Sequence, residues 1–344
     1  MAMSDNSAGT ASRVYAVDGY SSLVSLFMTL APPPAVGVRL PWSKLPARLL
    51  AALERWLDVP VMEAVTQPGG FSPGAAARVR TRDGRRVFIK AVGPELNPDA
   101  PAIYRREAHI VAALPPDVPA PRLLWTYDEG PDGWIMLVCD DIEGRHPAQP
   151  WLAHEMDRVL ETLVSLSTVL TPSPIAAAPA SDTFATNICG WRRLQAGPPD
   201  QLDVWSACHL DALADLEAHG PAAVAGDTLV HMDVRADNLL MTPNRVVLVD
   251  WPHACVGAAW VDVMAFAPSV AMQGGPEPEH VLIRHPAARH ADPNDITAAV
   301  ASLAGYFTSK ALLPAPPGIP TLRPFQAAQG VVARRWLAQR TRWS

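Results

Sequence analysis

The strongest indication of the fold lies in residues 228–262, TLVHMDVRADNLLMTPNRVVLVDWPHACVGAAWVD. This stretch carries His231, Asp233 and Asn238 in the pattern H-x-D-x-x-x-x-N, and its later apolar run, VVLV, ends at Asp250. A Thr-Pro-Asn turn signal separates the two halves, so the pattern predicts a strand, a tight loop, a short strand, a turn and a strand. Asp233 and Asp250 are therefore expected at the same edge of these strands.

These residue types suit phosphoryl transfer. The transferred group stays negatively charged throughout the reaction, so a protein mainly positions it and neutralises it with cations. We expect Asp233 to orient the attacking hydroxyl and take its proton. Asn238 and Asp250 offer oxygen atoms, the ligands that Mg²⁺ prefers. The stretch thus predicts magnesium-dependent transfer of a phosphoryl group.

A glycine-rich loop and a hairpin precede this stretch. After a strand at 61–65, the segment QPGGFSPG (residues 67–74) contains glycines that let backbone N–H groups approach an anion. Strands at 76–81 and 86–92 then flank an Asp-Gly hairpin turn. The second strand, RVFIKAV, places Lys90 among apolar residues.

The segment 101–114 has the period of a helix, and its apolar positions bracket Glu107. A carboxylate on a buried stripe costs several kcal/mol unless it is paired. Lys90 is the available partner. Two further strands, at 121–127 and 134–138, complete an expected five-stranded antiparallel sheet.

Residues 228–262, called the catalytic stretch below, together with Lys90 and Glu107 resemble the kinase-like phosphotransferases, specifically the aminoglycoside phosphotransferase family. The resemblance implies an α+β, bilobal, protein-kinase-like fold with a five-stranded antiparallel sheet plus a helix in the N-lobe and a mainly helical C-lobe. It implies an N-terminal extension (1–40), a nucleotide-binding N-lobe (41–143), and a C-lobe with the catalytic loop and acceptor site (144–344).

The resemblance also implies roles for individual residues. Asp233 and Arg235 are the expected catalytic residues, and Asn238 and Asp250 the expected magnesium ligands. The residues expected to bind the nucleotide, through the glycine loop, the ion pair and the hinge, are Gly69, Gly70, Ser72, Gly74, Lys90, Glu107, Cys139, Asp140 and Asp141.

Three residues around the catalytic loop have alternative roles. Arg235 either clamps phosphate oxygens in bidentate fashion or forms a surface pair with Asp237. His231 is expected to support the structure by bonding the backbone near Asp250. Asp262 either holds the catalytic loop through backbone hydrogen bonds or caps the following helix.

Helical patterns occupy much of the remaining sequence. Ser43 is expected to cap a first helix, and later helices are predicted at 151–170 and 201–219, the second ending at a Gly-Pro pair. Two more are predicted at 294–312 and 323–343, after a long loop at 273–295 that is either functional or disordered.

Composition excludes several other classes of protein. A net charge of −6 and the lack of a basic stripe argue against a nucleic-acid partner. The four cysteines show no C-x-x-C spacing, which favours a reducing cytoplasm. The apolar stretch 23–31 is too short for a membrane span.

The expected function is a small-molecule kinase that transfers the γ-phosphate of ATP or GTP to a hydroxyl of an antibiotic or related natural product. A kinase of a primary metabolite, such as choline or homoserine, and an inactive nucleotide-binding module are the alternatives. A protein kinase is disfavoured because no activation segment follows Asp250. Residues 145–344 hold 18 acidic and 14 basic side chains, which does not support a polycationic acceptor.

Overall fold

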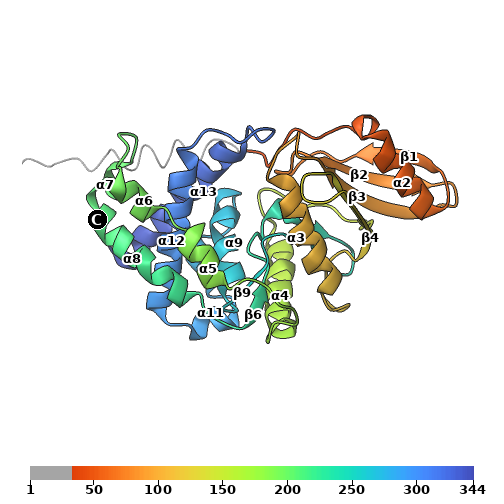
Figure 1. The fold of residues 1–344 in the computed structure, drawn as a ribbon. Coiled ribbons are helices and arrows are strands. Elements are labelled where there is room, and N and C mark those ends of the chain that lie inside the picture. The colour runs from red at the N-terminus through yellow and green to blue at the C-terminus, as the bar shows by residue number, and fades with distance from the viewer. Residues whose placement is uncertain (1–32) are drawn as a thin grey trace, which may run out of the picture. The chain divides into compact units, whose positions relative to one another are not determined.

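A five-stranded antiparallel sheet occupies the first part of the protein (Figure 1). The computed structural model describes residues 33–344, so most of the predicted extension, up to residue 32, lies outside the described residues. The sheet has the strand order β1-β2-β3-β5-β4. Its strands are β1 (Val61–Thr66), β2 (Ala75–Thr81), β3 (Arg86–Val92), β4 (Leu123–Asp128) and β5 (Ile135–Asp140). The prediction of five antiparallel strands is confirmed.

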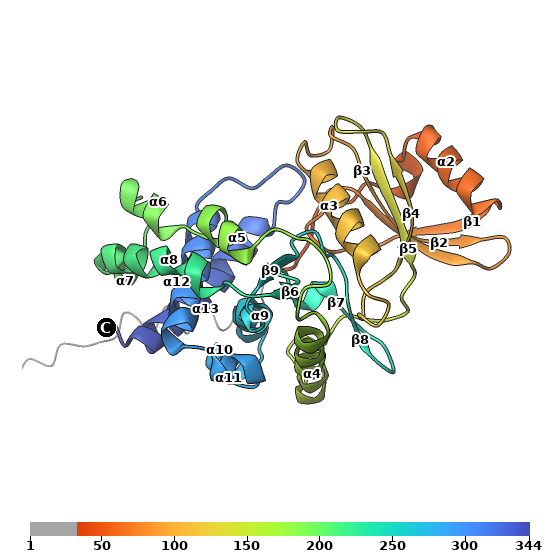
Figure 2. The same cartoon turned by 60° about the horizontal axis from the view of Figure 1, so that its bottom comes forward.

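Two helices cover opposite faces of this sheet (Figure 2). Helix α2 (Ala47–Leu57) packs its leucines on alternate residues of the strands, including Ile89. Helix α3 (Ala100–Ala113) packs on the other face, where Tyr104 clusters with strand residues of that face such as Leu137. Because side chains of a strand point to opposite faces in turn, Lys90 lies on the α3 side.

The start of α2 differs from the prediction. Ser43 lies inside a 3₁₀ turn, η1 (Trp42–Lys44), and Pro46 precedes the first residue of the helix without a side-chain cap. The Pro46 carbonyl accepts the first helical hydrogen bond, from the Leu49 N–H at 2.9 Å. Ser43 lies three residues before this N-cap position, too early in the chain to cap the helix.

The rest of the described chain is mainly helical, as predicted. Helix α12 (Pro293–Ala311) is central because it packs against both α8 (Leu210–Ala223) and α13 (Leu322–Thr341). The other helices are α4 (Ala153–Val169), α5 (Ala180–Thr186), α6 (Trp191–Ala196), α7 (Val204–Cys208), α9 (Val261–Met272), α10 (Pro278–Leu282) and α11 (Pro286–His290).

Three helical predictions need correction. The helix predicted at 201–219 is divided into α7 and α8, and α8 continues through Gly220 and Pro221. Gly220 lies against Ser302 of α12, where an added Cβ would lie 2.1 Å from the serine hydroxyl. The glycine thus serves helix packing rather than termination. The predicted loop 273–295 contains α10 and α11, and α5 and α6 occupy the segment before residue 201, where no helix was predicted.

The catalytic stretch forms two small two-stranded sheets. Strand β6 (Thr228–Val230) pairs with β9 (Cys255–Gly257), and β7 (Leu239–Met241) pairs with β8 (Val246–Leu248). A 3₁₀ turn, η2 (Ala236–Asn238), precedes β7. The predicted order of strand, loop, strand, turn and strand is present.

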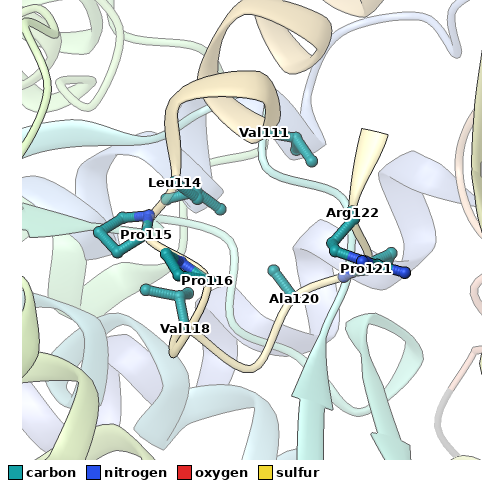
Figure 3. A pocket seen from close by; sticks show the side chains of 8 residues that line it. All are labelled: Val111, Leu114, Pro115, Pro116, Val118, Ala120, Pro121 and Arg122. Atoms are coloured by element: carbon teal, nitrogen blue, oxygen red, sulfur yellow. The ribbon is translucent and has the colours of Figure 1, made fainter. Parts of the chain in front are cut away.

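The connection between α3 and β4 links the sheet to this stretch. Proline and aliphatic side chains of residues 114–121 line a shallow hollow there (Figure 3). The Leu248 N–H of β8 donates to the Pro119 carbonyl at 2.8 Å. The boundaries proposed at residues 40 and 143 stay a prediction. In the part of the chain that the structure describes, no helix has the length and apolar character needed to cross a membrane.

Candidate active site

Asp262 holds the catalytic loop at its start. Its carboxylate accepts hydrogen bonds from the backbone N–H groups of His231 (2.9 Å) and Met232 (2.8 Å). Met232 has a positive φ of 65°, a conformation that costs energy for a residue with a side chain. Burial raises the pKa of Asp262 to about 6, while these two bonds oppose that shift. The contacts match the loop-holding alternative, since Trp260 is the N-cap of α9.

His231 connects the catalytic loop to the segment that carries Asp250. Its ring nitrogen Nε2 lies 3.0 Å from the Val249 carbonyl, and Nδ1 accepts from the Asp233 N–H at 3.2 Å. The ring packs against Trp251 with 4.5 Å between centroids. Burial lowers the pKa of His231 to about 4, so the ring is neutral at pH 7.

Asp233 and Asn238 form a single hydrogen-bonded unit. The Asn238 amide nitrogen donates to the Asp233 carbonyl (2.8 Å) and to its carboxylate (3.0 Å). Donation through the nitrogen fixes the direction of the amide, so its oxygen is free to face a cation. Burial raises the pKa of Asp233, although Arg235 opposes the shift. A raised pKa suits a carboxylate that must accept a proton.

Lys90 lies between two carboxylates. Its ammonium nitrogen is 2.5 Å from Glu107 Oε2 and 2.7 Å from Asp250 Oδ1. Glu107 is buried, as the helical pattern predicted, and the contact expected with Lys90 is present. Burial raises the pKa of Glu107. At Asp250 the effect of burial is exceeded by the charge and hydrogen bond of Lys90 together with the charges of His253 and Arg235, so the pKa of that carboxyl is lowered. Asp250 therefore keeps its negative charge.

Arg235 makes the contact with Asp237 that was one of its two alternatives, and it also contacts Asp233. Its guanidinium donates to the two carboxylate oxygens of Asp237 at 3.0 Å each and also pairs with Asp233. Only 15% of the side chain is exposed, so this is not a surface pair. The guanidinium lies 5.3 Å from the ring of Phe71 and 5.9 Å from that of Phe325. These aromatic contacts bring the glycine loop and α13 to the catalytic loop.

The glycine loop is held by the segment that precedes η1. The Arg39 guanidinium donates to the carbonyls of Gly69 (2.9 Å) and Ser72 (2.7 Å). Gly70 donates its N–H to Ala35 at 2.8 Å, so this N–H does not project towards a ligand as the glycine pattern suggested. Gly74 lies so close to β3 that an added Cβ would be 2.3 Å from the Ala91 carbonyl. The loop is therefore fixed rather than open.

The predicted hinge lies at the end of β5. Cys139 is buried there, and burial raises the pKa of its thiol to about 12. The carboxylate of Asp140 pairs with Arg122 at 2.8 Å, and that of Asp141 pairs with Arg86 at 2.7 Å. Because both carboxylates have cationic partners, any contact with a purine would come from the backbone.

Several residues near the site carry no signal in the sequence. Phe71 and Phe325 meet edge to face with centroids 5.1 Å apart. Tyr306 of α12 accepts a hydrogen bond from Gln326 at 3.3 Å. Burial raises the pKa of the Tyr306 hydroxyl, and the charge of Asp233 raises it further. Such contacts join residues that are 20 or more positions apart, so no local pattern reveals them.

The oxygen atoms of Asn238 and Asp250 fit a magnesium ion. Mg²⁺ is usually held by one or two carboxylates together with substrate phosphates, so a large protein cage is not needed. Within residues 33–344 no cluster of three or more His, Cys, Asp or Glu side chains could hold a metal by itself. The fixed amide and the ionised carboxylate supply hard oxygen donors, which match this cation.

Comparison with known proteins gives a consistent result. The family model of the phosphotransferase enzymes (APH) matches residues 6–296. A thermostable mutant of aminoglycoside phosphotransferase APH(4)-Ia, in a ternary complex with AMP-PNP and hygromycin B, is similar in structure: the TM-score is 0.57 and the identity 15%, covering 84% of this chain and 98% of that one.

Two other solved structures are also similar. Choline kinase LicA from Streptococcus pneumoniae has a TM-score of 0.55 and 13% identity, covering 84% of this chain and 100% of that one. A macrolide 2'-phosphotransferase type I has a TM-score of 0.52 and 15% identity, covering 85% and 98%. No curated protein sequence matched. The predicted kinase-like fold and the family resemblance are confirmed.

Proposed function

Because the chain belongs to the phosphotransferase enzyme family, we propose that it is a small-molecule kinase that transfers the γ-phosphate of ATP or GTP to a hydroxyl of an antibiotic or related natural product. The single observation that best supports this is the union of Asp233 and Asn238 in one hydrogen-bonded unit. It places a proton acceptor beside an oxygen donor for a cation, the two functions that phosphoryl transfer requires.

In the proposed reaction Asp233 accepts the proton of the acceptor hydroxyl. The hydroxyl oxygen then forms a bond to the γ-phosphorus, and the bond from that phosphorus to the β,γ-bridging oxygen breaks, which releases the nucleoside diphosphate. Lys90, held by Glu107, contacts the nucleotide phosphates, and Arg235 turns from Asp233 to the transferred group.

Magnesium would be held by Asn238 and Asp250 and would neutralise the phosphate oxygens. Lys90 and Asp250 are in contact in this structure, so the ammonium and the cation would share that carboxylate. The proposed compartment is the cytoplasm. The four cysteines, all within the described residues, are unpaired, which agrees with a reducing environment.

A nucleotide-consumption screen tests the proposal. ATP and GTP, each with Mg²⁺, are offered with a panel of hydroxylated antibiotics and primary metabolites, and the products are checked for one added phosphoryl group. We expect turnover with at least one antibiotic or related product. Turnover confined to primary metabolites would support the metabolite kinase instead. Nucleotide binding without turnover of any acceptor would support an inactive module.

A further inference from the structure

Three cations near the proposed acceptor side have no carboxylate partner among residues 33–344. They are Arg193 of α6, Lys310 of α12 and Arg323 of α13, and we call them the basic cluster. None of them takes part in an ion pair in the described part of the chain, although most other arginines there do. Lys310 and Arg323 are half-buried and Arg193 is exposed. Lys and Arg side chains are almost never fully buried without a partner, and partial burial carries part of the same desolvation cost.

Contacts with one tyrosine place Lys310 and Arg323 together. The ammonium of Lys310 lies 6.0 Å from the ring centroid of Tyr306. Arg323 donates to the side-chain oxygen of Gln326 at 2.7 Å, and Gln326 in turn donates to the Tyr306 hydroxyl at 3.3 Å. Two of the cations are therefore linked to Tyr306 of α12, Lys310 directly and Arg323 through Gln326.

Helix α6 brings the third cation. Gly190, the N-cap of α6, lies against α12, where an added Cβ would be 1.9 Å from the Gly305 carbonyl. Arg193 follows one turn later and donates only to neutral groups, the Thr186 carbonyl at 2.6 Å and the Cys189 sulfur at 3.0 Å. Within the described residues, no carboxylate is therefore paired with its guanidinium.

The basic cluster is linked to the proposed catalytic base through α12 and α13. Phe325 follows Arg323 by two residues, and its ring lies 5.9 Å from the Arg235 guanidinium, which pairs with Asp233. Burial raises the pKa of Tyr306, and the charge of Asp233 raises it further. A molecule that extends from Asp233 towards Tyr306 and α13 would meet the cluster with another of its groups.

The position of Arg323 is electrostatically unfavourable for the protein alone. It lies in the first turn of α13, which contains no acidic residue, and helix N-termini repel cations. Burial, followed by the charges of Arg193 and Arg323, lowers the pKa of Lys310. The nearby acids are already occupied: Asp237 pairs with Arg235, and Glu217 accepts from the backbone of α6. An external anion would relieve this repulsion.

We propose that the basic cluster binds an anionic group of the acceptor, a carboxylate or a phosphate, so that the substrate is a hydroxylated acid rather than a polycation. This inference rests on the proposed function. It explains why the surroundings of Asp233 provide cations where an amine-rich acceptor would need carboxylates. Each charge-assisted hydrogen bond to the anion would strengthen binding by about tenfold or more.

A binding experiment with matched compounds tests this. Each hydroxylated scaffold is prepared as carboxylate, phosphate monoester, carboxamide and amine, and binding is measured calorimetrically with Mg²⁺ and a non-hydrolysable ATP analogue present. The wild type is compared with Lys310→Gln/Arg323→Gln. The control variant, Lys44→Gln/Arg82→Gln, removes the same charge at exposed positions. Melting curves show whether each variant is folded.

We expect wild type and the control variant to bind carboxylates or phosphates in preference to the amides and amines. In Lys310→Gln/Arg323→Gln this binding should weaken at least about tenfold while affinity for the ATP analogue stays the same. Comparison of the carboxylate and phosphate versions of each scaffold identifies which anion the cluster binds. Binding confined to amides or amines, no binding of any acid, or equal binding of acids by the folded variant overturns the inference.

The outcome is separable from that of the proposed function. Acids that bind through the cluster but receive no phosphoryl group would contradict the kinase function and leave the anion site standing. Phosphorylation of amides or amines alone would leave the kinase function standing and contradict the anion site. Single variants, Lys310→Gln and Arg323→Gln, replace the double variant if it does not fold.

Discussion

Lys90 and Asp250, which stand 160 positions apart in the sequence, are joined by a hydrogen bond of 2.7 Å. The same ammonium also contacts Glu107. One cation thus links the sheet, helix α3 and the catalytic stretch. Only 12% of the lysine side chain is exposed, so water cannot replace these contacts easily.

Replacement of this cation should affect both stability and nucleotide binding. Lys90→Met keeps the side-chain length but leaves two carboxylates without their partner, which should cost up to about 3–5 kcal/mol of unfolding free energy. Mg²⁺–nucleotide should raise the melting temperature of the wild type clearly more than that of Lys90→Met. The exposed Lys44→Met is the control. Equal nucleotide-induced shifts in wild type and Lys90→Met would mean that Lys90 does not contact the nucleotide.

The role of Asp233 can be tested by removing its basicity. Asp233→Asn should lower the rate of transfer by about 10²–10⁴ because the acceptor hydroxyl loses its general base. Nucleotide affinity should change little. Turnover is measured by nucleotide consumption, with the exposed Asp227→Asn as the control. A rate within threefold of the wild type would exclude Asp233 as the base.

Metal dependence follows from the oxygen donors of Asn238 and Asp250. Activity should require Mg²⁺ or Mn²⁺ and disappear in EDTA, then return when excess metal is added. Asp250→Ala should be inactive and should bind nucleotide weakly in the presence of Mg²⁺. Full activity in the chelator would be incompatible with the proposed phosphotransferase mechanism.

His231 should make stability depend on pH. The folded-state pKa of about 4 lies below the value of about 6.5 expected for the unfolded chain, so the unfolded state binds the proton first as pH falls. The contribution of the neutral ring is complete above pH 6.5. It should decline by about 3 kcal/mol between pH 6.5 and 4.

Denaturant unfolding of the wild type and His231→Gln over this range measures the effect. The variant has no imidazole, so the difference in unfolding free energy between the two proteins should shrink as pH falls. A difference that stays constant from pH 7 to pH 4 would show that His231 is protonated equally in both states.

Arg39 should help to fix the glycine loop for nucleotide binding. Arg39→Gln removes the bonds to Gly69 and Ser72, and we expect the KM for nucleotide to rise by about tenfold while kcat changes less. Steady-state kinetics with varied ATP or GTP give both constants. Arg55→Gln, at an exposed position of α2, is the control. An unchanged KM would show that the loop holds its position without the guanidinium.

The parts of the fold that could be predicted from the sequence depend on local patterns. The Asp-Gly turn specifies the β2-β3 hairpin, and the helical period around Glu107 indicates a buried acid. The oxygen donors and proton acceptor of the catalytic stretch lie within 30 residues of each other, so their chemistry is visible in one segment. Periodicity and turn residues act over short distances along the chain, which is why these elements can be predicted from the sequence.

Other parts depend on contacts between distant segments. The sequence pattern predicts that a helix ends at Gly220, yet α8 continues through it. The glycine is needed there because a side chain would clash with Ser302. Phe71 and Phe325 look like ordinary apolar residues until folding places them on Arg235. The Ala35–Arg39 segment also gives no sign that it will hold the glycine loop. Residue type alone does not state which partner a side chain will have.

The segment from Pro33 to Leu40 has a practical consequence for shortened forms of the protein. Besides its contacts with the glycine loop, it bonds to the stretch before α13: the Val38 N–H donates to Gly318 at 2.7 Å, and the Thr321 hydroxyl donates to Val36 at 2.7 Å. A version that starts at Pro33 keeps all of these bonds. A version that starts at Pro41 loses these bonds, so neither the glycine loop nor the start of α13 is held by this segment. Removal of eight residues would therefore loosen two separate parts of the site at once.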